Sequence, residues 1–461
     1  MNNSNKKRGN GAGPSNGSRA DRPGTAREAA LDVLVRTEQD RSYSNLLLHQ
    51  TIQKYRLDKS DAALATEIVY GTIQRLNTID YFLEKFVAKG MAKLQPWVRS
   101  LLRLSFYQMY YLDRIPDHAI VNEAVNLAKK KGHQGISGMV NGVLRNVIRQ
   151  KDTLQIPDNL PAAERISLVH SHPQWLVSRW LRQLGEAMTE QICEANNMPP
   201  RVSIRANTMK LGRNELVELL QQADLQAEPS DLAPAGVIVK GAGNMALTPW
   251  FAEGLFSIQD ESSMLVAEAV DPQPGEKVLD CCAAPGGKTM HMAEKMKDNG
   301  QVWACDVHEH KAKLIQEQAN RLGLKSVKTL TADARTLTER FEEESFDRIL
   351  LDAPCSGLGV IRRKPDMKWS KLEQELDDIC VIQRELLNEV HKLLRPGGIL
   401  VYSTCTIEHN ENEGMVQAFL RDHPEFEWAD EQEPIQIYPY EHQSDGFFIA
   451  KLRKRAFSGE L

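Results

Sequence analysis

The sequence predicts a multidomain protein with three folded parts: an all-α bundle over residues 24–152, a small α+β domain over 160–270, and an α/β, Rossmann-like domain over 271–455. Three observations support this prediction. A chain of 461 residues exceeds what one hydrophobic core usually serves. Apolar side chains recur at helix spacing throughout the first part. In the last part, short apolar runs alternate with helix-like stretches, which is typical of a mostly parallel sheet with helices on both faces.

The first part follows a segment with almost no large apolar side chains. Residues 1–23 are rich in Asn, Gly, Ser and Arg, and we expect a disordered basic arm because they can bury too little surface to offset chain entropy. Helix periodicity then continues over one long stretch at 64–87 and over 97–112, where Pro96 suits a first helical turn. Stretches at 118–131 and 136–149 complete about six helices.

Charge is distributed unevenly between the parts. Residues 1–152 contain 24 Lys and Arg against 14 Asp and Glu, whereas the remainder contains 33 against 48. A basic module on an acidic body indicates a polyanionic partner, although chance and a basic tail would give the same balance. The last two helices of the bundle could contact RNA phosphates or form an ordinary solvated face. Their basic residues are Lys129, Lys130, Lys131, Arg145 and Arg149.

The middle part mixes helices and strands. Residues 152–164 contain two prolines and little periodicity, so we expect a linker there. The expected strands are 202–206, 236–239 and 254–258, and the expected helices are 167–184, 189–197, 213–223 and 259–270. In the last domain, the expected strands are 278–281, 302–305, 327–330, 348–351, 399–402 and 447–452, and the expected helices are 289–297, 311–322, 372–394 and 413–422.

The composition argues against several classes of protein. No run approaches the roughly 18 apolar residues that cross a bilayer, so no membrane association is expected. The basic amino terminus has no apolar segment behind it, unlike a secretory signal. Seven scattered cysteines then indicate reduced thiols in a cytoplasmic protein. There is no Cys-x-x-Cys pair, and we interpret His170-Ser171-His172 as a loop, so no metal site is predicted.

Two cysteines are the strongest candidates for chemistry. Cys355 lies in the run DAPCSG (352–357) after the strand at 348–351, and Cys405 lies in STCT (403–406) after the strand at 399–402. The carboxyl ends of strands in one parallel sheet face a common crevice, where ligands bind. An ionised thiol is a strong nucleophile, so the pair indicates covalent chemistry on a poorly reactive partner.

A candidate nucleoside site lies at the ends of three earlier strands. The first strand is followed by a glycine turn that opens a helix, where the backbone can approach a ligand closely and the helix amino end favours an anion. Asp306 ends the second strand, where a carboxylate can hold ribose hydroxyls. Asp333 ends the third strand and could accept from an adenine amino group. Either carboxylate alone would more often be a loop or cap residue, but together with the turn they predict a nucleoside ligand.

An adenosine-type pocket beside two thiols is compatible with S-adenosylmethionine and with methylation of a poor nucleophile. Carbon 5 of cytosine is such an atom, and thiolate attack on carbon 6 makes it enamine-like, so that it can take the methyl group. Asp352 precedes Cys355 by three residues, and as a carboxylic acid it could hydrogen-bond cytosine N3 and stabilise the adduct. The alternative for Asp352 is a turn cap before proline.

With these motifs together, residues 271–455 resemble the catalytic domain of the RNA cytosine-5 methyltransferases of the Nol1/Nop2/Sun family. The resemblance implies that Cys405 attacks the base and that Cys355 assists release of the methylated product. The residues alone do not rank the thiols, and spacing slightly favours Cys355 as the nucleophile, because DNA cytosine methyltransferases use a Pro-Cys thiol. The resemblance also implies contacts to S-adenosylmethionine at Cys282, Ala283, Ala284, Pro285, Gly286, Gly287, Lys288, Asp306, Asp333 and Asp352.

The bundle resembles the RNA-binding fold of the antitermination factor NusB, through VNEAV (121–125), Lys129-Lys130 and VNGVLR (140–145). A NusB-like module joined to this catalytic domain implies 16S ribosomal RNA as the substrate and no particular protein partner. The target cytosine must leave its stack, so an unpaired or flipped base is expected. Two alternatives are transfer RNA as the substrate and a non-catalytic RNA-binding or assembly factor; the intact pair of thiols argues against the second.

The remaining candidates lie outside these motifs. The basic run Arg362-Arg363-Lys364 follows the Cys355 motif, and beside the expected base pocket we predict RNA phosphate contact rather than a solvated loop. The other cysteines are expected to be core residues (Cys193, Cys380), strand or buried residues (Cys281, Cys305) and a backbone contact to the ligand (Cys282).

Overall fold

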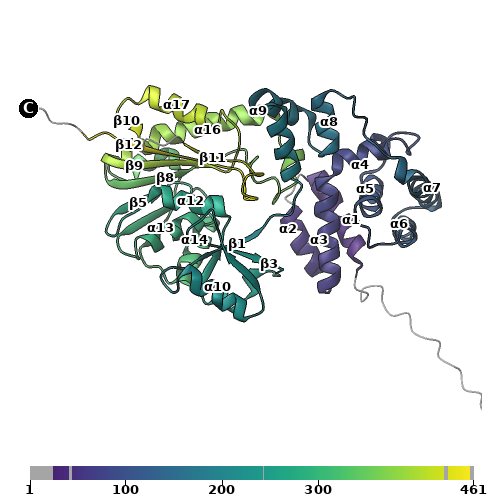
Figure 1. Ribbon diagram of the computed structural model, residues 1–461, viewed down its shortest axis with the longest axis horizontal. Helices are drawn as coiled ribbons and strands as arrows, with labels where there is room; N and C mark the ends of the chain where they lie inside the picture. The colour runs from purple at the N-terminus through teal and green to yellow at the C-terminus, as the bar shows by residue number, and fades with distance from the viewer. Residues whose placement is uncertain (1–23, 41–43, 242, 430–433, 457–461) are drawn as a thin grey trace, which may run out of the picture. The chain divides into compact units, whose positions relative to one another are not determined.

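A computed structural model describes residues 24–40, 44–241, 243–429 and 434–456 of the chain. The basic arm expected over 1–23 lies outside the described residues. The chain divides into two compact units, the first within 1–73 and 82–154 and the second within 74–81 and 155–461 (Figure 1).

The first unit is all-α, as predicted. Its helices bury apolar side chains such as Leu31, Ile68, Phe106 and Val140. The helices of this part of the chain are α1 (Ala26–Asp40), α2 (Ser44–Lys54), α3 (Lys59–Gln74), α4 (Leu76–Leu83), α5 (Pro96–Tyr111), α6 (Asp117–Lys131) and α7 (Gln134–Gln150), with the short 3₁₀ turns η1 (Met91–Lys93) and η2 (Lys151–Thr153). The end of α3 and most of α4 are assigned to the second unit.

The single helical stretch expected at 64–87 is wrong. The chain breaks between α3 and α4 at Arg75, and α4 ends at Leu83. At the start of α4, the backbone N–H of Asn77 donates to Ser171 Oγ over 2.9 Å, and its side-chain amide donates to Ser167 Oγ over 2.9 Å. The Ser171 hydroxyl therefore satisfies a backbone donor at the start of α4 that a continuous helix would have bonded internally, a contact that helix periodicity does not reveal.

The second unit begins with α8 (Ala162–Val169) and α9 (Gln174–Ala195). The two helices expected here, 167–184 and 189–197, are divided differently in the structure. The gap between α8 and α9 lies at residues 170–173, and α9 continues through residues 185–188 with a kink at Gly185, whose φ is 78°. A small antiparallel sheet follows, with the order β2-β3-β1-β4. Its elements are β1 (Val202–Ala206), α10 (Arg213–Gln222), β2 (Gln226–Pro229), β3 (Gly236–Lys240), η3 (Met245–Leu247), α11 (Pro249–Ala252) and β4 (Phe256–Ile258).

The predicted α+β character of this part is confirmed, but strand β2 escapes the sequence pattern. It is an edge strand of four residues in which Ala227 alone is buried, so it has no apolar alternation to find. The core beneath the sheet joins Ile204, Leu216, Val237 and Phe256.

The last part is a mostly parallel sheet, as predicted, in the order β10-β12-β9-β8-β5-β6-β7, with β11 paired to β12. The strands β5 to β9 run parallel, and β10, β11 and β12 are antiparallel additions at one edge. The elements are α12 (Glu261–Val270), β5 (Lys277–Asp280), α13 (Gly287–Lys295), β6 (Gln301–Asp306), α14 (Glu309–Leu322), β7 (Val327–Thr331), η4 (Ala334–Glu339), β8 (Phe346–Asp352), α15 (Met367–Ser370), α16 (Glu373–Val390), η5 (His391–Leu393), β9 (Leu394–Thr404), α17 (Glu413–Asp422), β10 (Phe426–Trp428), β11 (Ile435–Ile437) and β12 (Phe447–Lys454).

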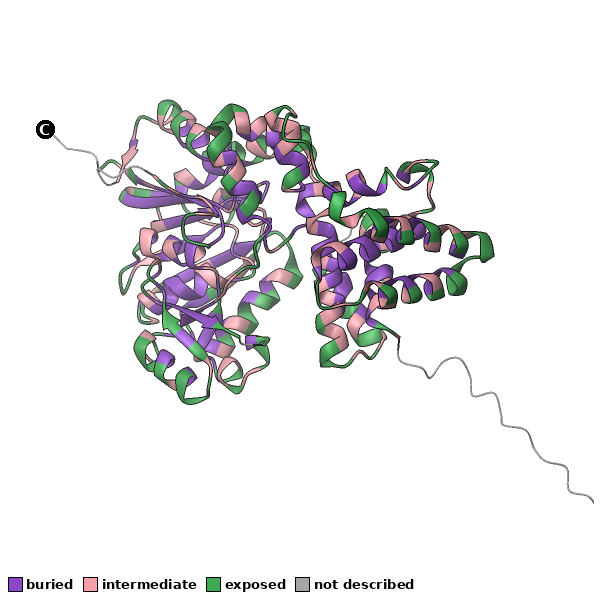
Figure 2. Ribbon diagram, turned by 45° about the vertical axis from the view of Figure 1, so that its right-hand side comes forward, coloured by how far each residue is buried: buried purple, intermediate pink, exposed green. Residues whose placement is uncertain are grey.

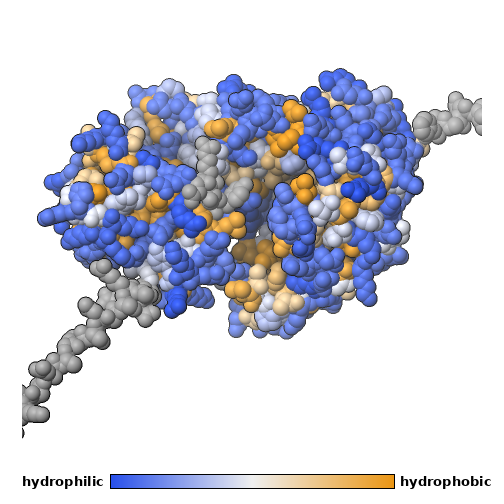
Figure 3. Space-filling model, turned by 180° about the vertical axis from the view of Figure 1, so that it is seen from behind, coloured by the Kyte–Doolittle hydropathy of each residue, from blue (hydrophilic) through white to orange (hydrophobic). Residues whose placement is uncertain are grey.

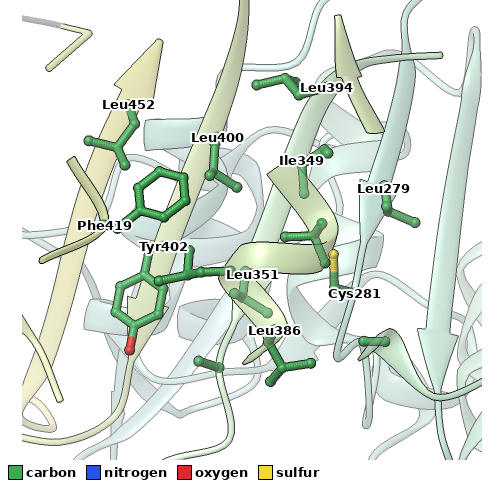
Figure 4. Close-up of a cluster of buried hydrophobic side chains, with 14 of the residues drawn as sticks. Leu279, Cys281, Ile349, Leu351, Leu386, Leu394, Leu400, Tyr402, Phe419 and Leu452 are labelled. Carbon is green, nitrogen blue, oxygen red and sulfur yellow. The ribbon is translucent and has the colours of Figure 1, made fainter. Parts of the chain in front are cut away.

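Alternate residues of the central strands enter two different cores. Figure 4 shows Leu279, Ile349 and Leu400 pointing into one cluster with Leu386 of α16 and Phe419 of α17. Their strand neighbours pack on the other face with α12, α13 and α14, a cluster that includes Val278, Leu350, Val401, Met290 and Ile315. The strands are buried on both faces (Figure 2), which explains why they appear in the sequence as continuous apolar runs.

The surface is mainly hydrophilic on the face that Figure 3 shows, with scattered apolar patches. Among the helices of the described segments, none combines the length and apolarity needed to span a bilayer.

Candidate active site

The parallel register brings the predicted functional residues to one edge of the sheet. Asp280, Asp306 and Asp352 end β5, β6 and β8, and β9 ends at Thr404, directly before Cys405. In this register Asp352 is paired with Ser403. Because the carboxyl ends of parallel strands form the ligand crevice of such sheets, the structure places the carboxylates and both thiol motifs around one site.

The glycine turn between β5 and α13 has the geometry that a close ligand approach requires. Gly286 caps α13 at φ 103°, a conformation that side chains with a Cβ rarely adopt. The turn is anchored where Ala283 N donates to Cys305 O over 2.8 Å. Burial raises the pKa of the Cys282 thiol, which keeps it protonated. These observations agree with a backbone role, rather than a thiol role, for Cys282.

Asp306 ends β6, as predicted, whereas β7 ends at Thr331 and Asp333 instead caps the 3₁₀ turn η4. The two aspartates also differ in how many hydrogen bonds their carboxylates already accept. Asp306 Oδ1 accepts from the backbone N–H of His308 over 3.0 Å. Asp333 accepts from Arg335 Nη2 over 2.7 Å and from the Arg335 backbone N–H over 2.9 Å, and these bonds lower the pKa of Asp333. Asp306 is therefore the more available acceptor, whereas Asp333 is shared with Arg335.

Lys288 and Asp352 form an ion pair in the centre of the site. Lys288 Nζ lies 2.7 Å from Asp352 Oδ2, and Ser403 Oγ donates to Asp352 Oδ1 over 2.8 Å. Burial alone would lower the pKa of Lys288, but the attraction of Asp352 outweighs it and the pKa is raised. The ammonium group thus stays charged beside the thiols, and Asp352 already accepts on both oxygens.

The two thiols are in direct contact. Cys355 Sγ and Cys405 Sγ are 3.4 Å apart. The loops that carry them are joined where Ser356 Oγ and Thr406 Oγ1 lie 2.8 Å apart and where Gly359 N donates to Cys405 O over 3.0 Å. The sequence predicts both cysteines at the ends of strands in one sheet, and the structure shows that these strands, β8 and β9, are neighbours and that the two thiols lie within hydrogen-bonding distance.

Neighbouring charges make the two sulfurs unequal. The hydrogen bond from the Cys355 thiol lowers the pKa of Cys405, and the charges of Lys288 and Lys364 act in the same direction against burial and Asp352. The pKa of Cys355 is raised, first by that hydrogen bond, in which it is the donor, then by burial, and also by the charge of Glu411. The favoured arrangement is a Cys405 thiolate that accepts from a protonated Cys355.

A polar segment after Cys405 fixes both loops, and sequence reasoning missed it. Glu411 Oε2 accepts from Ser356 N over 2.8 Å and from Gln383 Nε2 over 3.1 Å. Asn412 accepts from Thr404 Oγ1 over 2.5 Å. In the sequence, the run EHNEN (408–412) has the composition of a solvated loop; only burial shows its role.

Glu408 of the same segment is fully buried and ties the Cys405 loop to α9. Its carboxylate accepts from Arg179 Nε over 2.6 Å and from Trp180 Nε1 over 2.9 Å. Helix α9 therefore contributes to the position of the candidate nucleophile, a long-range contact with no signal in either local sequence.

The RNA-contact prediction for Arg362 and Arg363 is wrong. Arg362 is 4% exposed and donates to the backbone carbonyls of Pro439 and Gln443, each over 2.6 Å. Arg363 pairs with two buried carboxylates, Asp445 at 2.7 Å and Asp260 at 2.6 Å. Both guanidinium groups are committed to holding loops together, and Lys364 alone of the three is exposed.

The basic residues of the last two helices of the bundle are exposed, which both a contact with RNA phosphates and an ordinary solvated face require. Lys130 Nζ lies 2.6 Å from Glu28, and Lys131 Nζ lies 3.0 Å from Asp32, both on α1. Solvated ion pairs of this kind contribute little to stability, so they leave the lysines available to a polyanion.

Comparison with known proteins now identifies the family. The family described as 16S rRNA methyltransferase RsmB/F matches residues 267–453. A Bacillus subtilis protein named probable ribosomal RNA small subunit methyltransferase B is 45% identical over 450 residues, which cover 94% of this chain and 99% of that protein. The chain belongs to the RsmB/F family. The predicted resemblance is therefore confirmed at the level of the family.

The other matches confirm the three-part fold of this family member. The NusB family matches residues 24–149, and a ferredoxin-like domain of RsmF/B-like methyltransferases matches 172–246. The crystal structure of PH0851 is 29% identical with a TM-score of 0.80 and covers 93% of this chain and 98% of its own. The crystal structure of NSun6 from Pyrococcus horikoshii with SFG is 25% identical with a TM-score of 0.57 and covers 62% and 99%.

Proposed function

We propose that the protein transfers a methyl group from S-adenosylmethionine to carbon 5 of a cytosine in 16S ribosomal RNA through a covalent adduct. The contact of two thiols at 3.4 Å beside the Lys288–Asp352 ion pair is the observation on which this rests. The family gives the methyl transfer and the small-subunit RNA. We assign RNA affinity to the NusB-like module (24–152), and place the middle domain at 160–270 and catalysis in 271–455.

The residues around the glycine turn fit S-adenosylmethionine. Gly286 gives the turn a left-handed conformation, and residues 282–288 follow the carboxyl end of β5 and lead into α13, where we assign the contacts to the cofactor. Among the described residues, none donates a hydrogen bond to Asp306 Oδ2, which leaves it for ribose hydroxyls. Asp333 would share its oxygens between Arg335 and an adenine amino group. When bound, the cofactor supplies an electrophilic methyl group on a sulfonium.

The thiols then have separate roles. The Cys405 thiolate forms a bond to carbon 6 of cytosine, and the electrons of the carbon 5–carbon 6 double bond become available at carbon 5. After carbon 5 is methylated, its proton leaves to a base, the double bond re-forms and Cys405 is expelled. We assign assistance in this release to Cys355. We assign to Asp352 a hydrogen bond to cytosine N3, for which its carboxyl group must take up a proton and give up its contact with Lys288.

The rate of adduct formation should depend on pH through Cys405. Its lowered pKa means that the reactive thiolate persists to lower pH than for an ordinary cysteine. Replacing Cys355 with alanine removes the hydrogen bond that lowers this pKa, so the acidic limb of the rate of adduct formation should move to higher pH. Single-turnover adduct formation measured across pH would show this shift; an unchanged limb would mean that Cys355 does not stabilise the thiolate.

The substrate is best tested with three RNAs. Methyl incorporation should be strong on bare 16S RNA or on the 30S particle and absent on transfer RNA. Incorporation into transfer RNA alone would favour the alternative substrate, and incorporation into none would favour a non-catalytic assembly factor. Bisulfite mapping of RNA from cells lacking the protein should show that one cytosine, protected from deamination in normal cells, has become reactive, and an unchanged bisulfite pattern would contradict methylation at carbon 5.

A further inference from the structure

Three side chains that can bind a metal ion meet at the amino end of β9, far along the strand from Cys405. His391 opens η5 after α16, His423 follows α17, and Glu425 precedes β10. One ligand atom from each lies within 4.8 Å of the other two. Within the described ranges, no other group of three His, Cys, Asp or Glu side chains meets this condition.

The distances are close to those of a coordination shell. Glu425 Oε1 lies 3.3 Å from His423 Nδ1 and 3.8 Å from His391 Nδ1. In a tetrahedral zinc site with metal–ligand bonds of about 2.0–2.2 Å, ligand atoms are about 3.3–3.5 Å apart. The distance from His423 Nδ1 to Glu425 Oε1 already fits this spacing, and that from His391 Nδ1 to Glu425 Oε1 exceeds it by a few tenths of an ångström. His391 Nδ1 is buried and has no hydrogen-bond partner among the described residues, so its lone pair is unused.

The surroundings orient both imidazole rings for metal binding. His423 Nε2 lies 3.1 Å from Asn388 Oδ1 and His423 Nδ1 lies 3.3 Å from Glu425 Oε1, and both of these oxygens can only accept. With the hydrogen on Nε2, a cation between Nδ1 and Oε1 would replace the proton that otherwise joins these two atoms. Such an outer hydrogen bond commonly accompanies metal-bound histidine. The Phe419 ring packs at 5.9 Å from the His391 ring and at 4.5 Å from the His423 ring.

We propose that His391 Nδ1, His423 Nδ1 and Glu425 Oε1 form a binding site for a divalent transition metal ion, with Zn²⁺ as the best match. Two imidazoles and one carboxylate suit zinc better than magnesium or calcium, which prefer oxygen ligands alone. A metal here would join the ends of α16 and α17 to the start of β10. Because β9 separates it from Cys405, the ion stabilises the outer edge of the sheet and takes no part in methyl transfer.

The test is zinc binding to the full-length protein without an affinity tag, measured by competition with a chromophoric chelator. We expect one Zn²⁺ per chain at this site and a rise in the melting temperature on adding zinc. His423→Ala should weaken the affinity at least about 10-fold and abolish the rise. A matched control is His409→Ala, since His409 also lies near a glutamate, at 3.6 Å from Glu413, but has no second histidine; it should leave both measurements unchanged.

Cobalt distinguishes this site from the catalytic thiols, which could themselves bind a soft metal. Co²⁺ bound to two imidazoles and a carboxylate should show ligand-field bands without a sulfur-to-cobalt charge-transfer band. A spectrum with that band, lost in Cys355→Ser but kept in His423→Ala, would overturn the proposal. The absence of zinc binding at micromolar concentration, or binding that His423→Ala leaves intact, would overturn it as well. The melting temperature of metal-free His423→Ala shows whether the variant folds.

Discussion

Replacing Cys405 with alanine should reduce methyl transfer on the order of 10⁴-fold or more and should leave no covalent protein–RNA adduct, because the bond to carbon 6 can no longer form. Replacing Cys355 with alanine should instead let the adduct accumulate, since attack by Cys405 is intact but release is impaired. The two variants are compared by methyl incorporation and by the mobility of protein–RNA complexes on a denaturing gel.

The two variants are expected to differ in adduct formation because the two thiols would contact adjacent carbon atoms of the cytosine ring. Carbon 5 and carbon 6 are bonded neighbours in the cytosine ring. In the proposed adduct, with Cys405 bonded to carbon 6, the Cys355 sulfur would be near carbon 5, since the two sulfurs are 3.4 Å apart. The charge environment supports the same order, because Lys288 and Lys364 favour a thiolate at Cys405 whereas Glu411 disfavours one at Cys355.

The control is Cys380→Ala, which removes a partly buried thiol on α16 outside the site. It should retain methyl transfer and should form no lasting adduct. An adduct that accumulates in Cys405→Ala and is missing in Cys355→Ala would reverse the assignment of the two thiols. Loss of adduct in both variants, with folding intact, would show that both sulfurs are needed before the bond to carbon 6 forms.

The central strands and the thiol pair could be predicted from the sequence because their signals are local. Strands buried on both faces, such as β8 and β9, appear as continuous apolar runs, and their register then places Asp352 opposite Ser403. The glycine turn and the two cysteine motifs follow such runs directly, so their position at one edge of the sheet could be predicted from the sequence.

The remaining features depend on contacts between distant residues. Strands β10 and β11 have three residues each and occupy the antiparallel edge, too short for a periodic pattern. Arg363 looks like a solvated cation in the sequence, yet Asp260 and Asp445 hold it from positions far along the chain. Glu411 likewise becomes a determinant of the site only because Ser356 and Gln383 fold against it.

Replacing Arg205 with methionine should lower the free energy of unfolding of the second unit by about 3–5 kcal/mol, because it leaves the buried carboxylate of Glu294 without its partner. Arg205 is fully buried on β1, and its Nη2 lies 2.8 Å from Glu294 Oε1 on α13. The matched control is Lys240→Met on neighbouring β3, where the ion pair with Glu228 is more than half exposed and its loss should cost less than about 0.5 kcal/mol. Equal losses of melting temperature in the two variants would contradict the prediction.

Arg205 also donates from Nη1 to the backbone carbonyl of Gly287 over 2.7 Å, so the ferredoxin-like domain holds the glycine turn in place. Affinity for S-adenosylmethionine should therefore fall in Arg205→Met for a reason distinct from the buried charge. The double variant Arg205→Met with Glu294→Leu separates the two effects. Stability should largely recover, because no unpaired charge is left inside. The affinity for the cofactor should stay reduced, because the contact with Gly287 is still missing; full recovery of both would show that Arg205 acts on the turn only through folding.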